Sequence, residues 1–303
     1  MNPGSQPRRT GLPVRTEGLV HIYRSEGQDV AALAGVDLVV TAGELVALLG
    51  PSGAGKSTLL GLFGGLMRPS AGRIFVGNHN LADLDDGALD ALRSTEVGFV
   101  LQGAARNLLP YLSARQNVEF AQGAALRQGR EVPPADEVLA LVGLQADGDD
   151  LVGTMTPGDI QLAALAVALA GAPGLILADE PTSQLDDRAR DGVLDALLRL
   201  HETVGTTVIL VTHDPHVAAR VPRTVTIRDG RVGAEGGGGG EYAVVAADGS
   251  VPLPLEALEV FAPGAPVRIR EDDGRWVIEP WPGPTGPSAP ATPPTVGQGR
   301  GQS

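Results

Sequence analysis

Residues 50–58, with the sequence GPSGAGKST, constrain the fold of this chain more than any other stretch. The segment before them, GELVALL over 43–49, predicts a short buried strand, and the segment from residue 57, STLLGLFGGLM, predicts an apolar helix. A Gly-rich turn between a strand and a helix can also occur without a ligand. The GxxxxGKS spacing, however, is typical of a P-loop, in which backbone N–H groups and the helix N-terminus bind the phosphates of ATP. The sequence therefore predicts a nucleotide-binding α/β protein.

The residue types of this loop fit phosphate chemistry one by one. Glycines allow the backbone to approach a phosphate, a lysine ammonium can contact the β- and γ-phosphates, and the serine hydroxyl can ligate Mg²⁺. Lys56 is the only lysine of the chain, and every other basic residue is arginine. This usage indicates that a compact ammonium is needed at this position. The predicted nucleotide-binding residues of the loop are Gly50, Pro51, Ser52, Gly53, Ala54, Gly55, Lys56, Ser57 and Thr58.

An acidic pair follows a second predicted strand. Residues 175–178 are aliphatic, and Asp179 and Glu180 come directly after them. Such a strand can deliver an aspartate to the shell of a Mg²⁺ ion, through a water molecule, and a glutamate to the side of an attacking water. Exposed acidic pairs are common after strands, so the pair alone does not show that the chain hydrolyses a nucleotide. The P-loop about 120 residues upstream favours nucleotide hydrolysis.

Several motifs, taken in chain order, resemble those of ATP-binding-cassette (ABC) ATPases over about residues 14–232. The matching elements are Tyr23, GPSGAGKST, Gln102, LILADEPTSQLD over 175–186 and VTHDP over 211–215. RPSAGRIFVGNHNL (68–81) and NLLPYLSARQNV (107–118) are most similar to the subgroup of lipoprotein-release and macrolide-export type ATPases. The resemblance implies an α/β P-loop NTPase with a RecA-like core, an antiparallel β subdomain and a helical subdomain.

The resemblance also implies a role for each matching residue. It implies that Tyr23 stacks on adenine, and that Gln102 contacts Mg²⁺ and couples to a membrane partner. Glu180 is then the general base, and His213 touches the γ-phosphate. Asp186 belongs to a loop that crosses a dimer interface. By the same resemblance ATP and Mg²⁺ are the expected ligands.

One motif departs from the family pattern. The family signature LSGGQ is replaced here by Met155, Thr156, Pro157, Gly158 and Asp159, and Leu162 stands where the family usually has an arginine. In the family this loop closes over the ATP bound to the partner subunit.

Thr156 keeps a hydroxyl and Gly158 keeps flexibility, but Pro157 removes an N–H donor. Losing one charge-assisted bond to phosphate costs on the order of 1.5–3 kcal/mol. We therefore expect that the chain either forms a homodimer that hydrolyses ATP slowly or pairs with a different ABC ATPase in a heterodimer. The alternative is that the altered signature is tolerated variation.

The chain divides by composition into five segments. We expect a tail over 1–13, an ATPase domain over 14–232 with its helical subdomain at about 103–158, and a Gly-rich linker over 233–240. A small α+β module follows over 241–280, and 281–303 is expected to be disordered.

Within the module, an Asp-Gly turn at 273–274 predicts a hairpin with Val267, Ile269, Trp276 and Ile278 on one face. The module is weakly similar to the swapped-hairpin fold of bacterial transition-state regulators. Its eight acidic residues against three arginines argue against DNA binding. It is either a dimerisation or regulatory module, or a plain β cap on the ATPase.

Charge and composition exclude other classes. The net charge of −13 disfavours a nucleic-acid-binding surface, and the absence of cysteine suits a reducing compartment. The apolar stretch 160–178 is broken by Gly171, Pro173 and Gly174 and is too short to span a bilayer. His21, His79, His201 and His216 lack metal-ligand spacing.

The main hypothesis is an ATP-hydrolysing subunit that dimerises on ATP and powers a separate integral-membrane permease. It is expected in the cytoplasm, bound to the inner face of the membrane through that permease. The alternative is a nucleotide-gated signalling or scaffold subunit with little ATPase activity.

Overall fold

The computed structural model describes residues 11–281, except 26–27, 145–147, 238–239, 244, 246–248, 250, 252, 254 and 263. The chain divides into two compact units, Met1–Pro252 and Leu253–Ser303. Each unit is described by itself.

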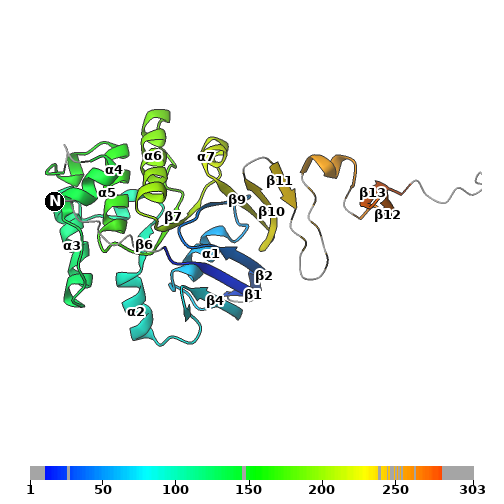
Figure 1. The fold of residues 1–303 in the computed structure, drawn as a ribbon, viewed down its shortest axis with the longest axis horizontal. Helices are drawn as coiled ribbons and strands as arrows, with labels where there is room; N and C mark the ends of the chain where they lie inside the picture. Colours follow the sequence, from blue (N-terminus) through cyan, green and yellow to red (C-terminus); the bar gives the residue numbers. More distant parts are fainter. Residues whose placement is uncertain are drawn as a thin grey trace, which may run out of the picture. The chain divides into compact units, whose positions relative to one another are not determined.

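A seven-stranded sheet forms the centre of the first unit (Figure 1). Its order is β11-β10-β9-β3-β8-β7-β6. The five parallel strands are β6 (Val97–Val100), β7 (Leu175–Asp179), β8 (Thr207–Val211), β3 (Leu45–Leu49) and β9 (Arg223–Arg228). The central strands β3, β7 and β8 read as aliphatic runs because a parallel sheet is covered on both faces, and every residue of β8 is buried.

A second, antiparallel sheet lies against one face of this core. Its order is β2 (Gln28–Val40), β1 (Val14–Ser25), β4 (Ala71–Val76) and β5 (His79–Asn80). The inward-facing residues of β2, among them Leu33 and Leu38, belong to one buried cluster with Leu59 and Phe63 of α1 (Lys56–Phe63) and Leu177 of β7. The P-loop helix is therefore packed between the two sheets.

The remaining helices are α2 (Asp86–Thr95), α3 (Ala114–Arg127), α4 (Ala135–Val142), α5 (Pro157–Leu169), α6 (Asp187–Thr203) and α7 (Pro215–Arg220), with 3₁₀ turns at Ala104–Asn107 and Val152–Thr154. Of these helices, α3 to α7 contribute to the second core cluster, whereas α2 packs into the first (Figure 1). Ser113 and Gln116 form a capping box at the start of α3, and Gly143, with φ 90°, ends α4 as its position predicts. The stretch 160–178 divides into α5 and β7, and no helix of the described ranges is long and apolar enough to cross a bilayer.

Two expectations about segment ends differ from the structure. The segment 233–240, expected to be a Gly-rich linker, belongs to the sheet wherever the structure describes it, because β10 (Arg231–Gly237) pairs with β11 (Gly240–Ala243). A Cβ on Gly237 would lie 2.8 Å from the carbonyl oxygen of Pro222, so this strand passes where no side chain fits. The end of the tail expected over 1–13 is also part of the fold, because Leu12 N donates to Gly174 O at 2.9 Å and Gly77 N donates to Pro13 O; residues 1–10 lie outside the described residues.

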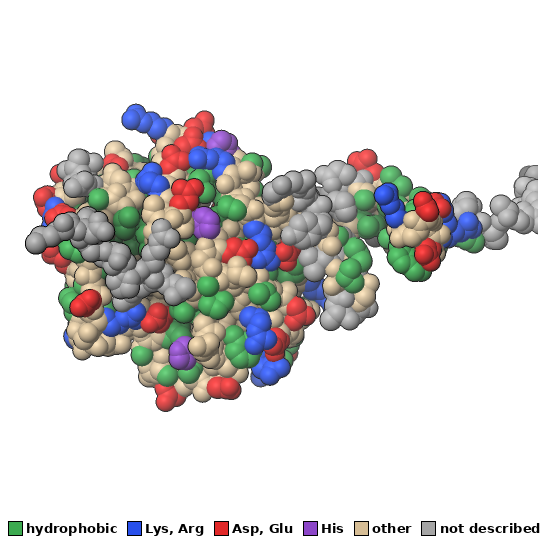
Figure 2. Space-filling model, in the orientation of Figure 1, with side chains coloured by type: hydrophobic (Ala, Val, Ile, Leu, Met, Phe, Trp, Pro, Cys, Tyr) green, Lys and Arg blue, Asp and Glu red, His purple; other side chains and the backbone are tan. Residues whose placement is uncertain are grey.

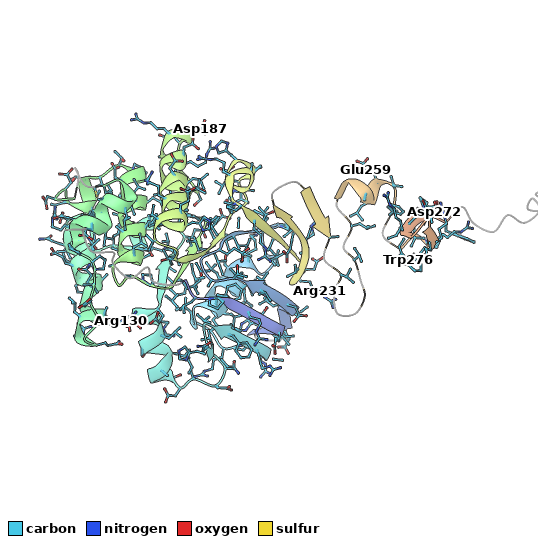
Figure 3. All side chains as sticks on the ribbon, in the orientation of Figure 1. Arg130, Asp187, Arg231, Glu259, Asp272 and Trp276 are labelled. Carbon is cyan, nitrogen blue, oxygen red and sulfur yellow. The ribbon has the colours of Figure 1, made fainter. Side chains whose placement is uncertain are left out.

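The second unit contains the predicted hairpin. A 3₁₀ turn (Leu255–Glu259) precedes β12 (Val267–Asp272) and β13 (Arg275–Pro280). The positive φ values of Asp273 (48°) and Gly274 (74°) are those of the tight turn that an Asp-Gly pair favours. The register pairs Ile269 with Ile278, so the predicted apolar face is confirmed; Figure 3 labels Trp276, which lies on it. The expected disordered tail falls outside the described residues from 282 onward.

Two glycines predict opposite effects of the same substitution. A Cβ on Gly98 of β6 would lie 2.2 Å from the carbonyl oxygen of Ala168, whereas a Cβ on Gly192 of α6 would meet nothing within 4 Å. We expect Gly98→Ala to lower the free energy of unfolding by about 2 kcal/mol or more because backbone must move. Gly192→Ala should raise it by about 0.5–1 kcal/mol, because alanine favours a helix interior. Urea unfolding of the two variants measures this, and equal effects would contradict the packing described for β6.

Candidate functional site

The backbone of the P-loop has conformations and contacts that only glycine tolerates. Gly50, Gly53 and Gly55 have φ values of 139°, 80° and 98°. A Cβ on Gly50 would lie 2.1 Å from the carbonyl oxygen of Ile227, and one on Gly55 would lie 2.4 Å from that of Ala32. The loop is therefore fixed against the end of β9 on one side and against β2 on the other.

Lys56 places its ammonium within the curve of this loop. The residue is buried, and Nζ donates to the carbonyl oxygens of Gly50 and Pro51, both at 2.8 Å. Gly55, the N-cap of α1, provides no side-chain hydrogen bond to the helix N-terminus. The first N–H groups of α1 and a lysine cation therefore converge on one position, which fits an anion such as a phosphate.

Ser57 and Asp179 are brought together from opposite halves of the sequence. Ser57 Oγ donates to Asp179 Oδ1 at 3.1 Å. Burial raises the pKa of Asp179, and the neighbouring Glu180 charge raises it further, while the Ser57 hydrogen bond and the Lys56 cation lower it. A hydroxyl and a carboxylate are ligands that Mg²⁺ accepts. Among the described residues no group of three or more His, Cys, Asp or Glu could hold a metal, so these two side chains can supply only part of a metal shell.

Glu180 and His213 form a hydrogen-bonded pair at the ends of β7 and β8. Glu180 has a φ of 50°, and its N–H donates to Val211 O at 3.0 Å, which holds it in this unusual backbone conformation. His213 Nδ1 lies 2.8 Å from Glu180 Oε1, and because an ionised carboxylate only accepts, the ring donates. The Glu180 side chain is 13% exposed and that of His213 is 73% exposed. The pair therefore presents a mostly buried carboxylate and an accessible ring at the carboxyl edge of the sheet.

The structure places Tyr23 beside the P-loop. Its hydroxyl lies 3.1 Å from Thr58 Oγ1, and its ring packs edge-on against His21 with centroids 4.8 Å apart. The side chain is about half exposed.

Gln102 is exposed and lies two residues beyond Val100, the last residue of β6, which pairs with Ala178. The Asn107 side chain holds the backbone of the preceding residue, Leu101, because it accepts from the Leu101 N–H and donates to the Leu101 carbonyl oxygen. Gln102 is thus placed at the same sheet edge as the acidic pair.

The altered signature forms the first turn of α5. Thr156 is the N-cap, and its hydroxyl accepts from Asp159 N at 3.2 Å and donates to Asp159 Oδ2 at 2.5 Å. Pro157 occupies the first helical position, where its missing N–H has no partner inside a helix. Its cost to the fold is therefore small, and only a ligand at this helix end would lose a donor. A Cβ on Gly158 would lie 2.9 Å from Ala189 Cβ, so the signature packs on α6.

The sequence analysis gave Asp159 no role, although the Thr-x-x-Asp spacing before an apolar run signals a helix cap. Asp186 is itself the N-cap of α6, with Oδ1 accepting from Ala189 N at 2.8 Å. In the described part of the chain, the hydrogen bonds of the Thr156 hydroxyl and carbonyl stay within the first turn of α5, and no hydrogen bond joins Thr156, Pro157 or Gly158 to the P-loop.

Fold and site together define a P-loop ATPase. The family model of the ABC transporter matches residues 33–183. The lipoprotein-releasing system ATP-binding protein LolD of Gluconobacter oxydans is 41% identical over 222 residues, which cover 72% of this chain and 94% of that protein. The macrolide export ATP-binding/permease protein MacB 1 of Yersinia pestis is 42% identical over 233 residues, which cover 77% of this chain but 35% of that protein.

Solved structures agree. A dimeric ATP-binding cassette in a post-hydrolysis state with ADP and phosphate bound superposes with a TM-score of 0.65 at 33% identity, covering 74% of this chain and 98% of that one. The chain belongs to the ABC transporter ATPase family, in the lipoprotein-release and macrolide-export group, and is an ATPase.

The raised pKa of Asp179 predicts a specific stability effect. Because the folded protein binds this proton more tightly than the unfolded chain does, stability falls as pH rises from the ordinary aspartate pKa through the raised one. At neutral pH without nucleotide or metal, Asp179→Asn should therefore raise the melting temperature by a small amount. The exposed Asp150 provides a control, and Asp150→Asn should leave the melting temperature unchanged. A lower melting temperature for Asp179→Asn would show that its ionised form stabilises the fold.

Proposed function

We propose that this chain is the ATP-hydrolysing subunit of a transporter and powers a separate integral-membrane permease through ATP-driven dimerisation. The observation that carries the proposal is the convergence of Lys56, Ser57, Asp179 and the Glu180–His213 pair at one edge of the sheet. One relative is named as the ATP-binding protein of a lipoprotein-releasing system, and another as a macrolide export ATP-binding/permease protein. These names support an ATPase bound to the cytoplasmic face of the membrane through a permease.

The residues of this site divide the work of hydrolysis. Lys56, the loop from Gly50 to Thr58 and the N-terminus of α1 bind the phosphates, and Tyr23 contacts the adenine. Ser57, Gln102 and, through water, Asp179 would hold Mg²⁺, which would supply positive charge that offsets the charge of the phosphate oxygens.

Glu180 accepts a proton from the attacking water as general base. The hydrogen bond from His213 Nδ1 holds the Glu180 carboxylate in place, and the exposed His213 ring would contact the γ-phosphate of bound ATP.

The structure also supports a weakened role for the signature in a dimer. In the proposed head-to-tail arrangement, the N-terminus of α5 meets the ATP of the partner, and the Asp186 loop crosses the interface. The Thr156 hydroxyl already donates to Asp159, whose carboxylate places a negative charge at the helix end that a phosphate would approach. Hydrolysis should therefore be slow in a homodimer. In a pair with another ABC ATPase, this chain would contribute its P-loop, Glu180 and His213 to one competent ATP site and its weak signature to the other.

The Thr156–Asp159 contact also favours a second candidate function. A subunit that binds ATP and dimerises but hardly hydrolyses it could act in signalling or as a scaffold. The two functions differ in ATP turnover when the permease is present, which should be strong only for a transport motor.

Figure 2 shows acidic and basic side chains interspersed over the visible face of the first unit, and we expect no nucleic-acid partner.

The C-terminal hairpin is proposed to serve dimerisation or regulation, or to cap the ATPase. Its apolar face leaves Val267, Ile269, Trp276 and Ile278 between 39% and 74% exposed. A lone two-stranded hairpin is marginally stable in water, so covering this face would stabilise it.

Restoring the signature should increase turnover. In the variant Pro157→Gly with Asp159→Gln, the first turn of α5 regains an N–H donor and loses the carboxylate. We expect the steady-state ATPase rate of the purified chain to rise about tenfold or more, as the recovery of one charge-assisted hydrogen bond implies.

Pro134→Gly, at the N-cap of α4, is the matched control and should leave the rate unchanged. An unchanged rate in the restored variant would show that the natural signature already works, and that slow turnover, where observed, has another cause.

A further inference from the structure

The helix that follows His213 is too short to hold its own position. Helix α7 has six residues, starts two residues after His213, and has Val217 as its buried residue. Isolated helices of this length are not stable in water. The placement of α7, and of the His213 loop that leads into it, therefore depends on contacts with neighbouring elements.

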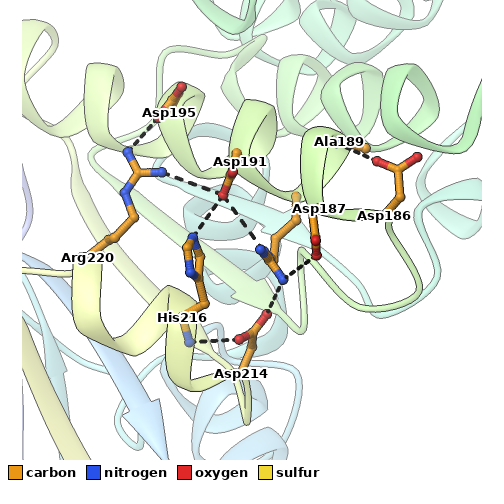
Figure 4. Close-up of polar contacts among 9 residues, drawn as sticks. Asp186, Asp187, Ala189, Asp191, Asp195, Asp214, His216 and Arg220 are labelled. Carbon is orange, nitrogen blue, oxygen red and sulfur yellow. Dashed lines mark hydrogen bonds and ion pairs between the residues drawn. The ribbon is translucent and has the colours of Figure 1, made fainter.

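Arg190 of α6 makes one of these contacts at the start of α7, and Figure 4 labels its two partners, Asp187 and Asp214. Its Nη1 lies 3.0 Å from Asp187 Oδ1 and 3.6 Å from Asp214 Oδ2. Asp214 is the residue after His213 and the N-cap of α7, because its Oδ1 accepts from His216 N at 2.8 Å. One guanidinium thus bridges the residue after Asp186 and the residue after His213.

Helix α7 is also held by further ion pairs with α6, shown in Figure 4. Asp191 Oδ1 lies 3.0 Å from His216 Nε2 and 3.8 Å from Arg220 Nη1, and Arg220 Nη2 lies 2.7 Å from Asp195 Oδ1. Asp191 and His216 are shared with the Arg190 contacts, because Asp191 Oδ1 lies 3.8 Å from Arg190 Nε and His216 N donates to Asp214. Arg220 pairs with Asp191 and Asp195 and, in the described part of the chain, with neither Asp187 nor Asp214, so it provides a control of equal charge at the other end of α7.

The Arg190 side chain is more buried than an ordinary surface ion pair requires. It is 18% exposed, against 36% for Arg220, and its Nε has no hydrogen-bond partner among the described residues; Asp191 Oδ1 lies 3.8 Å from this atom. A buried, incompletely bonded donor is costly, so fold stability alone explains poorly why a guanidinium is here.

We propose that Arg190 is a positioning residue for hydrolysis, which holds Asp214 and thereby keeps His213 in hydrogen-bond contact with Glu180. It also links the Asp186 loop to the His213 loop, so a movement of the first changes the position of the second. This inference rests on the proposed roles of Glu180 and His213, and it adds a residue that contacts neither nucleotide nor metal.

The direct test is the ¹⁵N NMR signal of the His213 ring in the full chain, labelled at histidine. The chain has five histidines, and His213→Asn assigns the signal. Glu180→Ala removes the hydrogen-bond partner and should shift the signal. Arg190→Ala should shift the same signal by a comparable amount, and Arg190→Lys by less, because one ammonium can still contact one of the two carboxylates. Arg220→Ala should leave the His213 signal in place.

Turnover provides a second readout. Arg190→Ala should lower kcat roughly fivefold and leave KM for ATP within about twofold, since the binding loop is untouched. Arg220→Ala should change neither parameter beyond about twofold. Melting temperatures identify any variant that fails to fold, in which case Arg190→Lys is the deciding variant.

Two outcomes would overturn the proposal in distinguishable ways. If Glu180→Ala shifts the His213 signal while Arg190→Ala and Arg190→Lys leave it unchanged, the positioning role of Arg190 is wrong and the proposed site stands. If Glu180→Ala itself leaves the signal unchanged, the Glu180–His213 pair does not exist in solution, and both the positioning role and the proposed site fail.

Discussion

The structure depends first on the close backbone contacts that fix the P-loop. Gly50 lies against the carbonyl of Ile227 and Gly55 against that of Ala32, at distances that leave no room for a Cβ. These contacts attach the loop to both sheets at once, so the curve that receives Lys56 is set before any ligand binds. Such preorganisation means that binding a phosphate needs little rearrangement of the backbone.

From this fixed loop the rest of the site follows by topology. The carboxyl ends of β3, β7 and β8 lie side by side, and each is followed by residues of the site. Ser57 and Asp179 meet although 122 positions separate them, and Glu180 meets His213 across 33 positions. Distant motifs become one site because parallel strands end at the same edge.

The parts that sequence predicted well are those with local causes. The strand predicted over 43–49 contains β3 (Leu45–Leu49), and the strand predicted over 175–178 is β7 (Leu175–Asp179), because aliphatic runs define both. The hairpin turn at Asp273 and Gly274 follows from positive φ.

Features that depend on contacts between residues distant in the sequence could not be predicted from the sequence. The glycine run enters the sheet because Gly237 passes close to Pro222, which no composition rule predicts. The Arg190 bridge to Asp214 joins helices 24 positions apart and has no sequence signal of its own.

The nucleotide site is well formed, but the signature is not free to bind a phosphate, because Asp159 already occupies the Thr156 hydroxyl and the N-terminal end of α5. Mg²⁺-dependent ATP turnover by the purified chain, measured alongside its Glu180→Gln variant, tests most directly whether the altered signature slows hydrolysis. The account predicts tight ATP binding with slow turnover that Glu180→Gln abolishes. Fast turnover by the chain alone would contradict it and would show that the altered signature supports an ordinary transporter motor.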